Sequence, residues 1–131
     1  MKFLLDTNVL LWGLVAEEKL NASAQEILKS SSSELYFSAA GSWEIAIKYA
    51  PGALSLPKPP SEYIPRALRI WAVRALDITH EHALSAGELP GHHRDPFDRM
   101  LVAQAITERM TLLTTDRALQ EYEVDLIYCG T

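Results

Sequence analysis

The chain has 131 residues and a formal net charge of −5 at pH 7, and 48% of its residues are hydrophobic while 22% are charged. This composition is typical of a globular protein with room for one hydrophobic core, so we expect a single domain over residues 1–131. The excess of acidic residues argues against a protein that coats nucleic acid through many lysine and arginine contacts, and no segment reaches the roughly 20 apolar residues that span a membrane.

Short apolar runs alternate with segments of helical periodicity along the chain. The apolar runs predict buried strands at 3–5, 35–37, 73–76 and 110–115, and an edge strand at 124–128. Apolar residues at helical spacing predict helices at 7–14, 20–28, 42–50, 61–71, 79–87, 95–106 and 117–122. Strands that alternate with helices indicate an α/β fold, in which right-handed crossovers build a parallel sheet that is covered on both faces.

Two aspartates directly follow predicted strands. Asp6 comes after the first strand and Asp116 after the fourth, and each also stands where a helix is expected to begin. Capping of that helix is a sufficient reason for either residue, because Asp is a favoured cap. In open α/β sheets, however, ligands bind beyond the carboxyl ends of the strands, where both carboxylates would lie. These two residues alone leave both explanations open.

Two further acids stand in the first turns of apolar helices. Glu44 could form an i,i+4 pair with Lys48, but such a pair contributes only about 0.2–0.5 kcal/mol. We expect the helix at 42–50 to be largely buried, so that Glu44 has to be paired or to bind a cation. Asp98 lies on the stripe of its helix that we expect to face the core. The helix dipole favours an acid in the first turn, but it does not explain why the acid faces inward.

The acids at strand ends and in first helical turns are Asp6, Glu44, Asp98 and Asp116. These elements meet at one edge of a doubly wound sheet. Carboxylates gathered there would repel one another unless a cation is bound, and a site of oxygen ligands suits Mg²⁺ or Mn²⁺. Asp95 has a sufficient role as the cap of the helix that begins at Pro96, so we leave it outside the predicted site.

Four motifs follow one another along the chain. They are Leu-Asp-Thr-Asn-Val-Leu-Leu-Trp at 5–12, Ser-Trp-Glu-Ile-Ala-Ile-Lys at 42–48, Asp-Pro-Phe-Asp-Arg-Met-Leu-Val-Ala-Gln-Ala at 95–105 and Leu-Leu-Thr-Thr-Asp at 112–116. Together they resemble the PIN-domain family, and within it the VapC-type toxins of type II toxin–antitoxin pairs. The resemblance implies a three-layer α/β/α fold with a central parallel β-sheet. It also implies an Mg²⁺- or Mn²⁺-dependent endoribonuclease, which hydrolyses RNA with a metal-activated water.

The same resemblance implies site residues and partners. The family's acidic positions, which serve as catalytic residues and metal ligands, fall on Asp6, Glu44, Asp98 and Asp116. The family's hydroxyl beside the site falls on Thr7 or Thr115. The implied partners are an RNA substrate, a second copy of the chain in a homodimer, and a small antitoxin protein that binds at the groove.

Several other side chains are candidates for contacts with the substrate. The cationic residues near the acids, which could hold phosphate, are Lys48, Arg99 and Arg117. Arg99 could equally pair with a neighbouring acid. The predicted loop before the helix at 95–106 contains His92, His93 and Arg94. These side chains are either solvated surface residues or contacts to RNA phosphate. Each tryptophan lies in an apolar stripe of a predicted helix. We therefore expect core or dimer contacts, in preference to base stacking, for Trp12, Trp43 and Trp71.

Two other functions stay open at this point. One is a noncatalytic binding module whose acids hold a structural ion or the basic tail of an antitoxin. The other is a different Mg²⁺-dependent phosphoryl-transfer enzyme on a similar sheet. An aspartyl-phosphate phosphatase would need a second aspartate two residues after Asp6, and the sequence has Asn8 there.

The sequence also bears on the compartment of the protein. The one cysteine, Cys129, cannot form an internal disulfide, so nothing indicates an oxidising environment. Asp6 and Asn8 interrupt the apolar run near the N-terminus, which is atypical of a secretory signal peptide. We therefore expect a cytoplasmic protein that does not associate with a membrane.

Overall fold

A parallel β-sheet forms the centre of the computed structural model, which describes residues 1–92 and 94–131. In that part of the chain the strands are β1 (Lys2–Leu5), β2 (Glu34–Ser38), β3 (Val73–Leu76), β4 (Thr111–Thr114) and β5 (Leu126–Tyr128). Their order in the sheet is β3-β2-β1-β4-β5, and every neighbouring pair is parallel. The N-terminal strand β1 therefore lies at the centre of the sheet, as its uninterrupted apolar sequence predicts.

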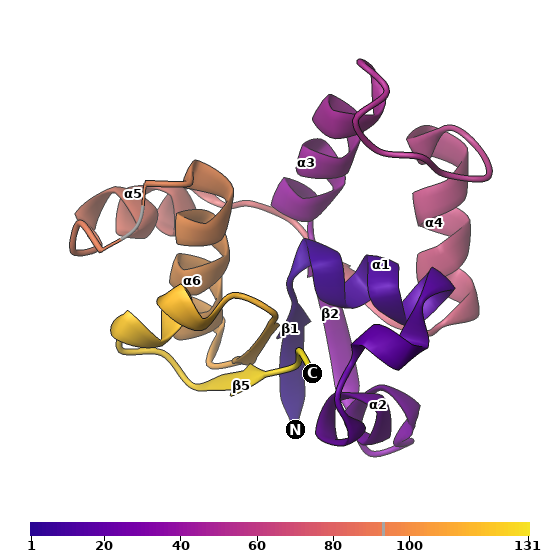
Figure 1. Cartoon of the computed structure of the whole chain (residues 1–131). Helices are drawn as coiled ribbons and strands as arrows, with labels where there is room; N and C mark the ends of the chain where they lie inside the picture. The colour runs from indigo at the N-terminus through magenta and orange to yellow at the C-terminus, as the bar shows by residue number, and fades with distance from the viewer. Residues whose placement is uncertain (93) are drawn as a thin grey trace.

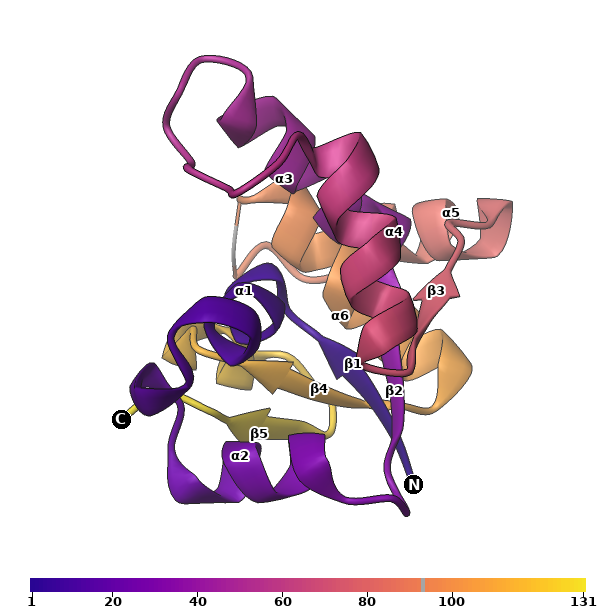
Figure 2. The ribbon, with the colours of Figure 1, turned by 90° about the vertical axis from the view of Figure 1, so that its right-hand side faces the viewer.

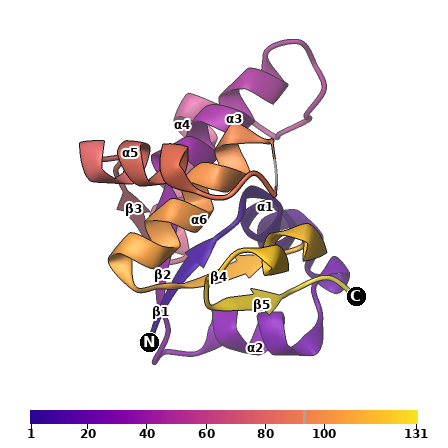
Figure 3. The same cartoon turned by 90° about the vertical axis from the view of Figure 1, so that its left-hand side faces the viewer.

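Helices cover both faces of this sheet. They are α1 (Thr7–Val15), η1 (Glu17–Lys19), α2 (Ala22–Lys29), α3 (Ala39–Tyr49), α4 (Pro60–Ile70), α5 (His80–Glu88), α6 (Pro96–Glu108) and η2 (Arg117–Glu121). Figure 2 looks onto the face covered by α1, α2 and α4, and Figure 3 onto the face covered by α5 and α6. Figure 1 shows the sheet between these two layers. The predicted three-layer α/β/α fold with a central parallel sheet is confirmed.

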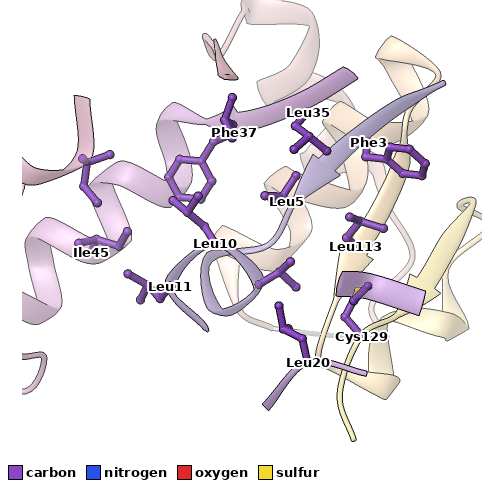
Figure 4. Close-up of a cluster of buried hydrophobic side chains, with 14 residues drawn as sticks. Phe3, Leu5, Leu10, Leu11, Leu20, Leu35, Phe37, Ile45, Leu113 and Cys129 are labelled. Atoms are coloured by element: carbon purple, nitrogen blue, oxygen red, sulfur yellow. The ribbon is translucent and has the colours of Figure 1, made fainter. Parts of the chain in front are cut away.

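Side chains of the central strands alternate between two hydrophobic cores, one on each face. Phe3, Leu5 and Leu113 belong to the core beneath α1, α2 and α4, whereas Leu4 and Leu112 pack with α6. Figure 4 shows the first of these cores, in which the strand side chains meet those of α1. Because successive strand residues point to opposite faces, an apolar run such as β1 supplies both cores at once.

The elements differ from the sequence-based bounds at several places, and a local cap explains the start of α3. We predicted a helix from residue 42, but α3 begins at Ala39 because the Ser38 hydroxyl accepts a hydrogen bond from the backbone N–H of Ala40 at 3.0 Å. The predicted helix at 117–122 is the 3₁₀ helix η2, and a short 3₁₀ helix at Glu17–Lys19 was not predicted. The predicted edge strand at 124–128 is shorter, since β5 begins at Leu126.

The prediction that the third helix is largely buried is wrong for one of its faces. In α3, Trp43 is 63% exposed and Ile47 is 47% exposed, whereas Glu44 and Ile45 are buried. The reason is the position of the helix, which rises from the carboxyl end of β2 beyond the edge of the sheet (Figure 1). It contacts α1, α4, α6 and β2. Trp43 is therefore not a core residue, and Trp71 is also exposed.

In the loop before α6, His92 and Arg94 are exposed, whereas His93 lies outside the described residues. Within the described chain, no helix has both the length and the apolar character that crossing a bilayer requires.

Candidate active site

Asp6 stands directly after the central strand and is the most deeply placed carboxylate of the predicted site. It caps α1, where one carboxylate oxygen accepts a long 3.4 Å hydrogen bond from the backbone N–H of Asn8. Its side chain is nevertheless buried, with the whole residue only 7% exposed. Burial raises the pKa of Asp6 above the ordinary value of 3.8, and the negative charge of Glu44 raises it further. Capping and a site role thus coexist in this residue.

Thr114 holds the other oxygen of Asp6. Its hydroxyl donates a 2.6 Å hydrogen bond to Asp6 Oδ2, and this bond lowers the pKa of Asp6 against the larger effect of burial. The same hydroxyl accepts a 3.0 Å hydrogen bond from the backbone N–H of Asp116. Thr114 is fully buried and joins the ends of β1 and β4.

Thr7 and Lys48 hold Glu44 from two sides. The Thr7 hydroxyl donates a 2.6 Å hydrogen bond to Glu44 Oε1, and the Lys48 ammonium lies 2.8 Å from Glu44 Oε2. The i,i+4 pair that we considered does form, but Glu44 is only 8% exposed, so the pair is more than a surface contact. Chain segments 37 residues apart meet here, because α1 and α3 start at the same edge of the sheet.

Asp98 stands in the first turn of α6 and faces the same region. The hydrogen bond with Glu44 raises the pKa of Lys48 above 10.5, and the charges of Glu44, Asp95 and Asp98 raise it further, while partial burial opposes them. Asp98 is half-buried, as is Asp95, which caps α6 by accepting a 2.9 Å hydrogen bond from the backbone N–H of Phe97. Asp95 therefore has the capping role that we predicted and also acts on the site through its charge.

Asp116 follows the end of β4 and precedes η2. Its side chain accepts a 2.9 Å hydrogen bond from the backbone N–H of Ala118 and so caps η2. Its backbone N–H is bound to the Thr114 hydroxyl, which is bound to Asp6. The two strand-end aspartates are thus connected through one buried threonine.

The two predicted arginines lie in different surroundings. The Arg99 guanidinium donates hydrogen bonds to the backbone carbonyls of Ala86 and Pro90 at 2.8 Å and of Leu89 at 3.0 Å. It therefore fastens the segment that connects α5 to α6. The Arg117 guanidinium lies 3.9 Å above the ring of Tyr128, on the β5 side of Asp116.

The hydroxyl beside the site was predicted at Thr7 or Thr115, and Thr114 was not among the predicted residues. Thr7 contacts Glu44, whereas Thr115 is half-buried and it is Thr114 that contacts Asp6. The register of the sheet carried the missing signal. Leu5 pairs with Leu113, so that Asp6 and Thr114 are the next residues on adjacent parallel strands. Alignment of Leu-Leu-Asp-Thr at 4–7 with Leu-Leu-Thr-Thr at 112–115 would have placed them side by side.

The side chains of the site offer carboxylate and hydroxyl oxygen atoms as possible ligands. Among residues 1–92 and 94–131, no three His, Cys, Asp or Glu side chains are gathered so as to hold one metal ion. The buried carboxylates nevertheless fit a hard divalent cation in donor type, because carboxylate and hydroxyl oxygens are its usual ligands. A cation there would also offset the repulsion between Asp6 and Glu44, which raises the pKa of Asp6.

Cysteine chemistry is a poor alternative for this site. Burial raises the pKa of the Cys129 thiol to about 11. The thiol therefore stays protonated at neutral pH, and a protonated thiol is a weak nucleophile.

Comparison with known sequences gives two matches. The family model of the PIN domain matches residues 3–124. Part of the chain is similar to Ribonuclease VapC16 of Mycobacterium tuberculosis (strain ATCC 25618 / H37Rv), at 36% identity over 56 residues. That alignment spans 43% of this chain and 40% of the relative's length.

Solved structures share the fold over nearly the whole chain. One is the crystal structure of VapBC2 from Rickettsia felis bound to a DNA fragment from their promoter. Its matched chain gives a TM-score of 0.73 at 18% identity, covering 99% of this chain and 100% of the other. Another is FitAcB from Neisseria gonorrhoeae, with a TM-score of 0.68 at 22% identity and coverage of 95% and 96%. At these identities the likeness is one of fold.

Proposed function

The chain belongs to the PIN domain family, whose model matches residues 3–124, and from this premise we propose that it is an Mg²⁺- or Mn²⁺-dependent endoribonuclease of the VapC type. One nuclease domain then occupies residues 1–131. The similarity of a 56-residue segment to Ribonuclease VapC16 supports the choice of RNA as substrate.

The observation that carries the proposal is the burial of Asp6 beside Glu44 at the carboxyl edge of the sheet. Stability does not account for the burial of Asp6, because the desolvation that raises the pKa of this carboxylate opposes folding while the group is charged. Helix capping would be served as well by an exposed aspartate or serine. A pair of buried acids at the edge where ligands bind is the arrangement that a cation-dependent hydrolase requires.

The proposed ligands of the ion are the four carboxylates Asp6, Glu44, Asp98 and Asp116. When bound, the ion would neutralise charge on the scissile phosphate and lower the pKa of a water molecule. Thr114 orients Asp6 through the 2.6 Å hydrogen bond, and Thr7 orients Glu44 in the same way. One of the carboxylates accepts the proton of the attacking water as general base.

Phosphate positioning falls to the cations at the rim of the site. Lys48 is the best placed, since its ammonium lies against Glu44 and its side chain is 55% exposed to an approaching substrate. Arg117 follows Asp116 and is exposed, so that its guanidinium could leave the Tyr128 ring to contact RNA. Arg99 is left out of this role, because its guanidinium holds backbone carbonyls between α5 and α6.

A toxin role with an antitoxin partner extends the proposal. The Rickettsia felis structure contains a VapBC2 pair, and its fold likeness to this chain supports a partner of the same kind. A surface groove of about 240 Å³ lies beside α4, and its lining includes the apolar or aromatic Leu14, Tyr63 and Trp71 and the basic Lys58 and Arg66. An amphipathic segment with acidic flanks would suit such a groove.

A homodimer is the second assembly that we propose. Trp43 and Ile47 lie one helical turn apart on the exposed face of α3, and Phe97 of α6 contacts the Trp43 ring edge-on at a centroid distance of 5.4 Å. Exposed apolar side chains grouped in this way favour burial against a second copy. Light scattering of the purified protein measures the association directly.

The nuclease proposal is tested with purified protein, RNA, and Mg²⁺ or Mn²⁺. Wild type should cleave RNA to fragments with 5′-phosphate ends and lose the activity in EDTA, while Asp6→Asn and Asp98→Asn should lose most of it with metal present. The matched control is Asp125→Asn, which changes an exposed acid at the opposite end of the sheet and should keep full activity. Equal cleavage by wild type and Asp6→Asn would refute the proposed site. Metal binding without any cleavage would favour a noncatalytic module.

The toxin role needs a separate test in cells. Expression of the wild type should arrest growth, and Asp98→Asn should relieve the arrest at equal protein level. Co-expression of the product of a neighbouring small open reading frame should also restore growth and co-purify with the chain. Growth arrest that persists with Asp98→Asn would separate toxicity from the nuclease site.

A further inference from the structure

Lys48 stands out among the basic side chains because it contacts Glu44, a buried acid of the predicted site. Its ammonium forms an ion pair with Glu44 at 2.8 Å, and Glu44 is almost wholly buried while Lys48 is half exposed. The pair joins adjacent turns of α3, because residues four apart lie on the same face of a helix. Lys48 therefore lies beside Glu44 at the edge of the predicted site.

Both oxygens of Glu44 are already engaged by protein donors. Oε1 accepts the hydrogen bond from Thr7 and Oε2 accepts the one from Lys48. Each oxygen keeps a further lone pair, but a divalent ion that approaches Oε2 meets the positive charge of the Lys48 ammonium, which lies 2.8 Å from that oxygen and repels the ion. Thr7 is buried and fixed at the start of α1, whereas Lys48 has a long, partly exposed side chain that can swing away. Lys48 is the donor that can yield.

The charges around Lys48 come from two helices. Glu44 precedes it on α3, and Asp95 and Asp98 act on it from the start of α6. One side chain thus supplies positive charge to a region that contains several carboxylates.

We infer that Lys48 is a built-in counter-cation, which competes with the divalent ion for Glu44 and passes to the RNA phosphate when the ion displaces it. This inference rests on the proposed metal-dependent function and concerns its regulation. It has two consequences. Lys48 weakens the binding of the ion to the free protein, and a phosphate that accepts the displaced ammonium restores that affinity. Metal and RNA therefore bind cooperatively through one side chain.

The first test measures Mn²⁺ affinity by isothermal titration calorimetry with protein stripped by EDTA and dialysed. Lys48→Met should bind Mn²⁺ about tenfold more tightly than wild type, because a charge within roughly 4–6 Å commonly shifts an ionic equilibrium by that factor. Lys48→Arg keeps the charge and should bind within about twofold of wild type. The matched control is Lys58→Met, which removes the lysine of another i,i+4 pair, with Glu62, away from the site and should leave the affinity unchanged.

The second test measures coupling, with a single-stranded oligodeoxynucleotide as the phosphate-bearing probe. In wild type a saturating amount of this probe should tighten Mn²⁺ binding several-fold, and in Lys48→Met the increase should largely disappear. An equal increase in both proteins would overturn the transfer of Lys48 to phosphate. The binding readout is independent of turnover, so a dead variant is still informative.

The outcomes separate this inference from the proposed function. If wild type cleaves RNA and binds Mn²⁺, but Lys48→Met binds the ion equally or more weakly, Lys48 is not a competitor and the inference fails alone. If wild type and Lys48→Met both fail to bind Mn²⁺ and wild type fails to cleave RNA, both proposals fall. Tighter binding by Lys48→Met, with Lys48→Arg and Lys58→Met like wild type, supports it.

Discussion

The Thr114 hydroxyl donates a 2.6 Å hydrogen bond to Asp6 across the ends of two adjacent parallel strands. This bond fixes the orientation of a carboxylate that burial would otherwise disfavour, and it partly offsets the rise in the pKa of Asp6 that burial causes. The pair shows how the fold holds the site, because the positions of both residues follow from the register of β1 and β4. The interaction also permits direct tests.

Removing the hydroxyl should destabilise the protein. Thr114→Val removes the 2.6 Å hydrogen bond to the buried Asp6 and the hydroxyl that accepts from the N–H of Asp116. We expect a loss of about 1.5–3 kcal/mol in the free energy of unfolding at pH 7, as for other hydrogen bonds to charged groups, together with weaker RNA cleavage. Urea denaturation measures the first effect. Thr114→Ser keeps the hydroxyl and should lose less than half as much, so equal losses would point to packing instead.

Neutralising Asp6 should have the opposite effect in metal-free buffer. Burial raises the pKa of Asp6 in the folded state above the unfolded value of about 3.8, so the folded state holds the proton more tightly. The contribution of this residue to stability is therefore fully present below pH 3.8 and is lost as the pH rises through the folded-state pKa. Asp6→Asn, which carries no charge, should be more stable than wild type at pH 7.5 in EDTA.

The pH dependence of this difference is the decisive measurement. The advantage of Asp6→Asn, expected to be about 1 kcal/mol or more at pH 7.5, should shrink as the pH is lowered, because wild-type Asp6 then becomes protonated too. Asp125→Asn, at an exposed position, should follow wild type throughout. A stability gain that is the same at pH 4 and pH 7.5 would show that the charge of Asp6 is not its source.

Divalent cations should reverse that order of stability. An ion that binds only the folded state stabilises it by about 2.7 kcal/mol when its concentration is a hundred times the dissociation constant. Addition of millimolar Mn²⁺ should therefore raise the melting temperature of wild type more than that of Asp6→Asn, and EDTA should undo the rise. Differential scanning calorimetry measures the shift. If Mn²⁺ stabilises both proteins equally, Asp6 is not among its ligands.

Much of the fold could be predicted from the sequence because its signals are local. The apolar runs of β1, β2 and β4 and the caps at Asp6, Asn21 and Asp95 each act within a few residues, and the structure places elements close to the expected ranges. The alternation of strands and helices then allows few topologies. The same reasoning failed for Trp43, because the exposure of a helix depends on where it lies relative to the edge of the sheet.

The predicted site depends in part on contacts that no local pattern contains. The sequence indicated Glu44 through the apolar character around it, and the structure adds its contact with Thr7, 37 residues away. Thr114 was missed because its partner Asp6 is 108 residues distant and becomes a neighbour only through strand register. Arg99 was predicted to bind phosphate because it directly follows Asp98 in the sequence. A side chain that long can turn away from its sequence neighbour, and here it reaches the carbonyls at the end of α5.

Arg99 should matter for stability more than for substrate binding. Its hydrogen bonds to the carbonyls of Ala86, Leu89 and Pro90 fasten the end of α5 and the segment that leads to Asp98. Arg99→Met leaves these acceptors without a charged donor and should lower the free energy of unfolding by about 2 kcal/mol or more. Arg99→Lys can reach only some of them and should give an intermediate value.

Hydrogen exchange and kinetics distinguish this role of Arg99 from a contact with RNA. In Arg99→Met, exchange should accelerate at residues 86–92, and the rate of cleavage should fall because Asp98 follows from that segment. Arg66→Met, at an exposed position on α4, should change neither quantity. If Arg99→Met has wild-type stability and exchange but a strongly raised KM for RNA, Arg99 binds substrate, as its place beside Asp98 in the sequence first indicated.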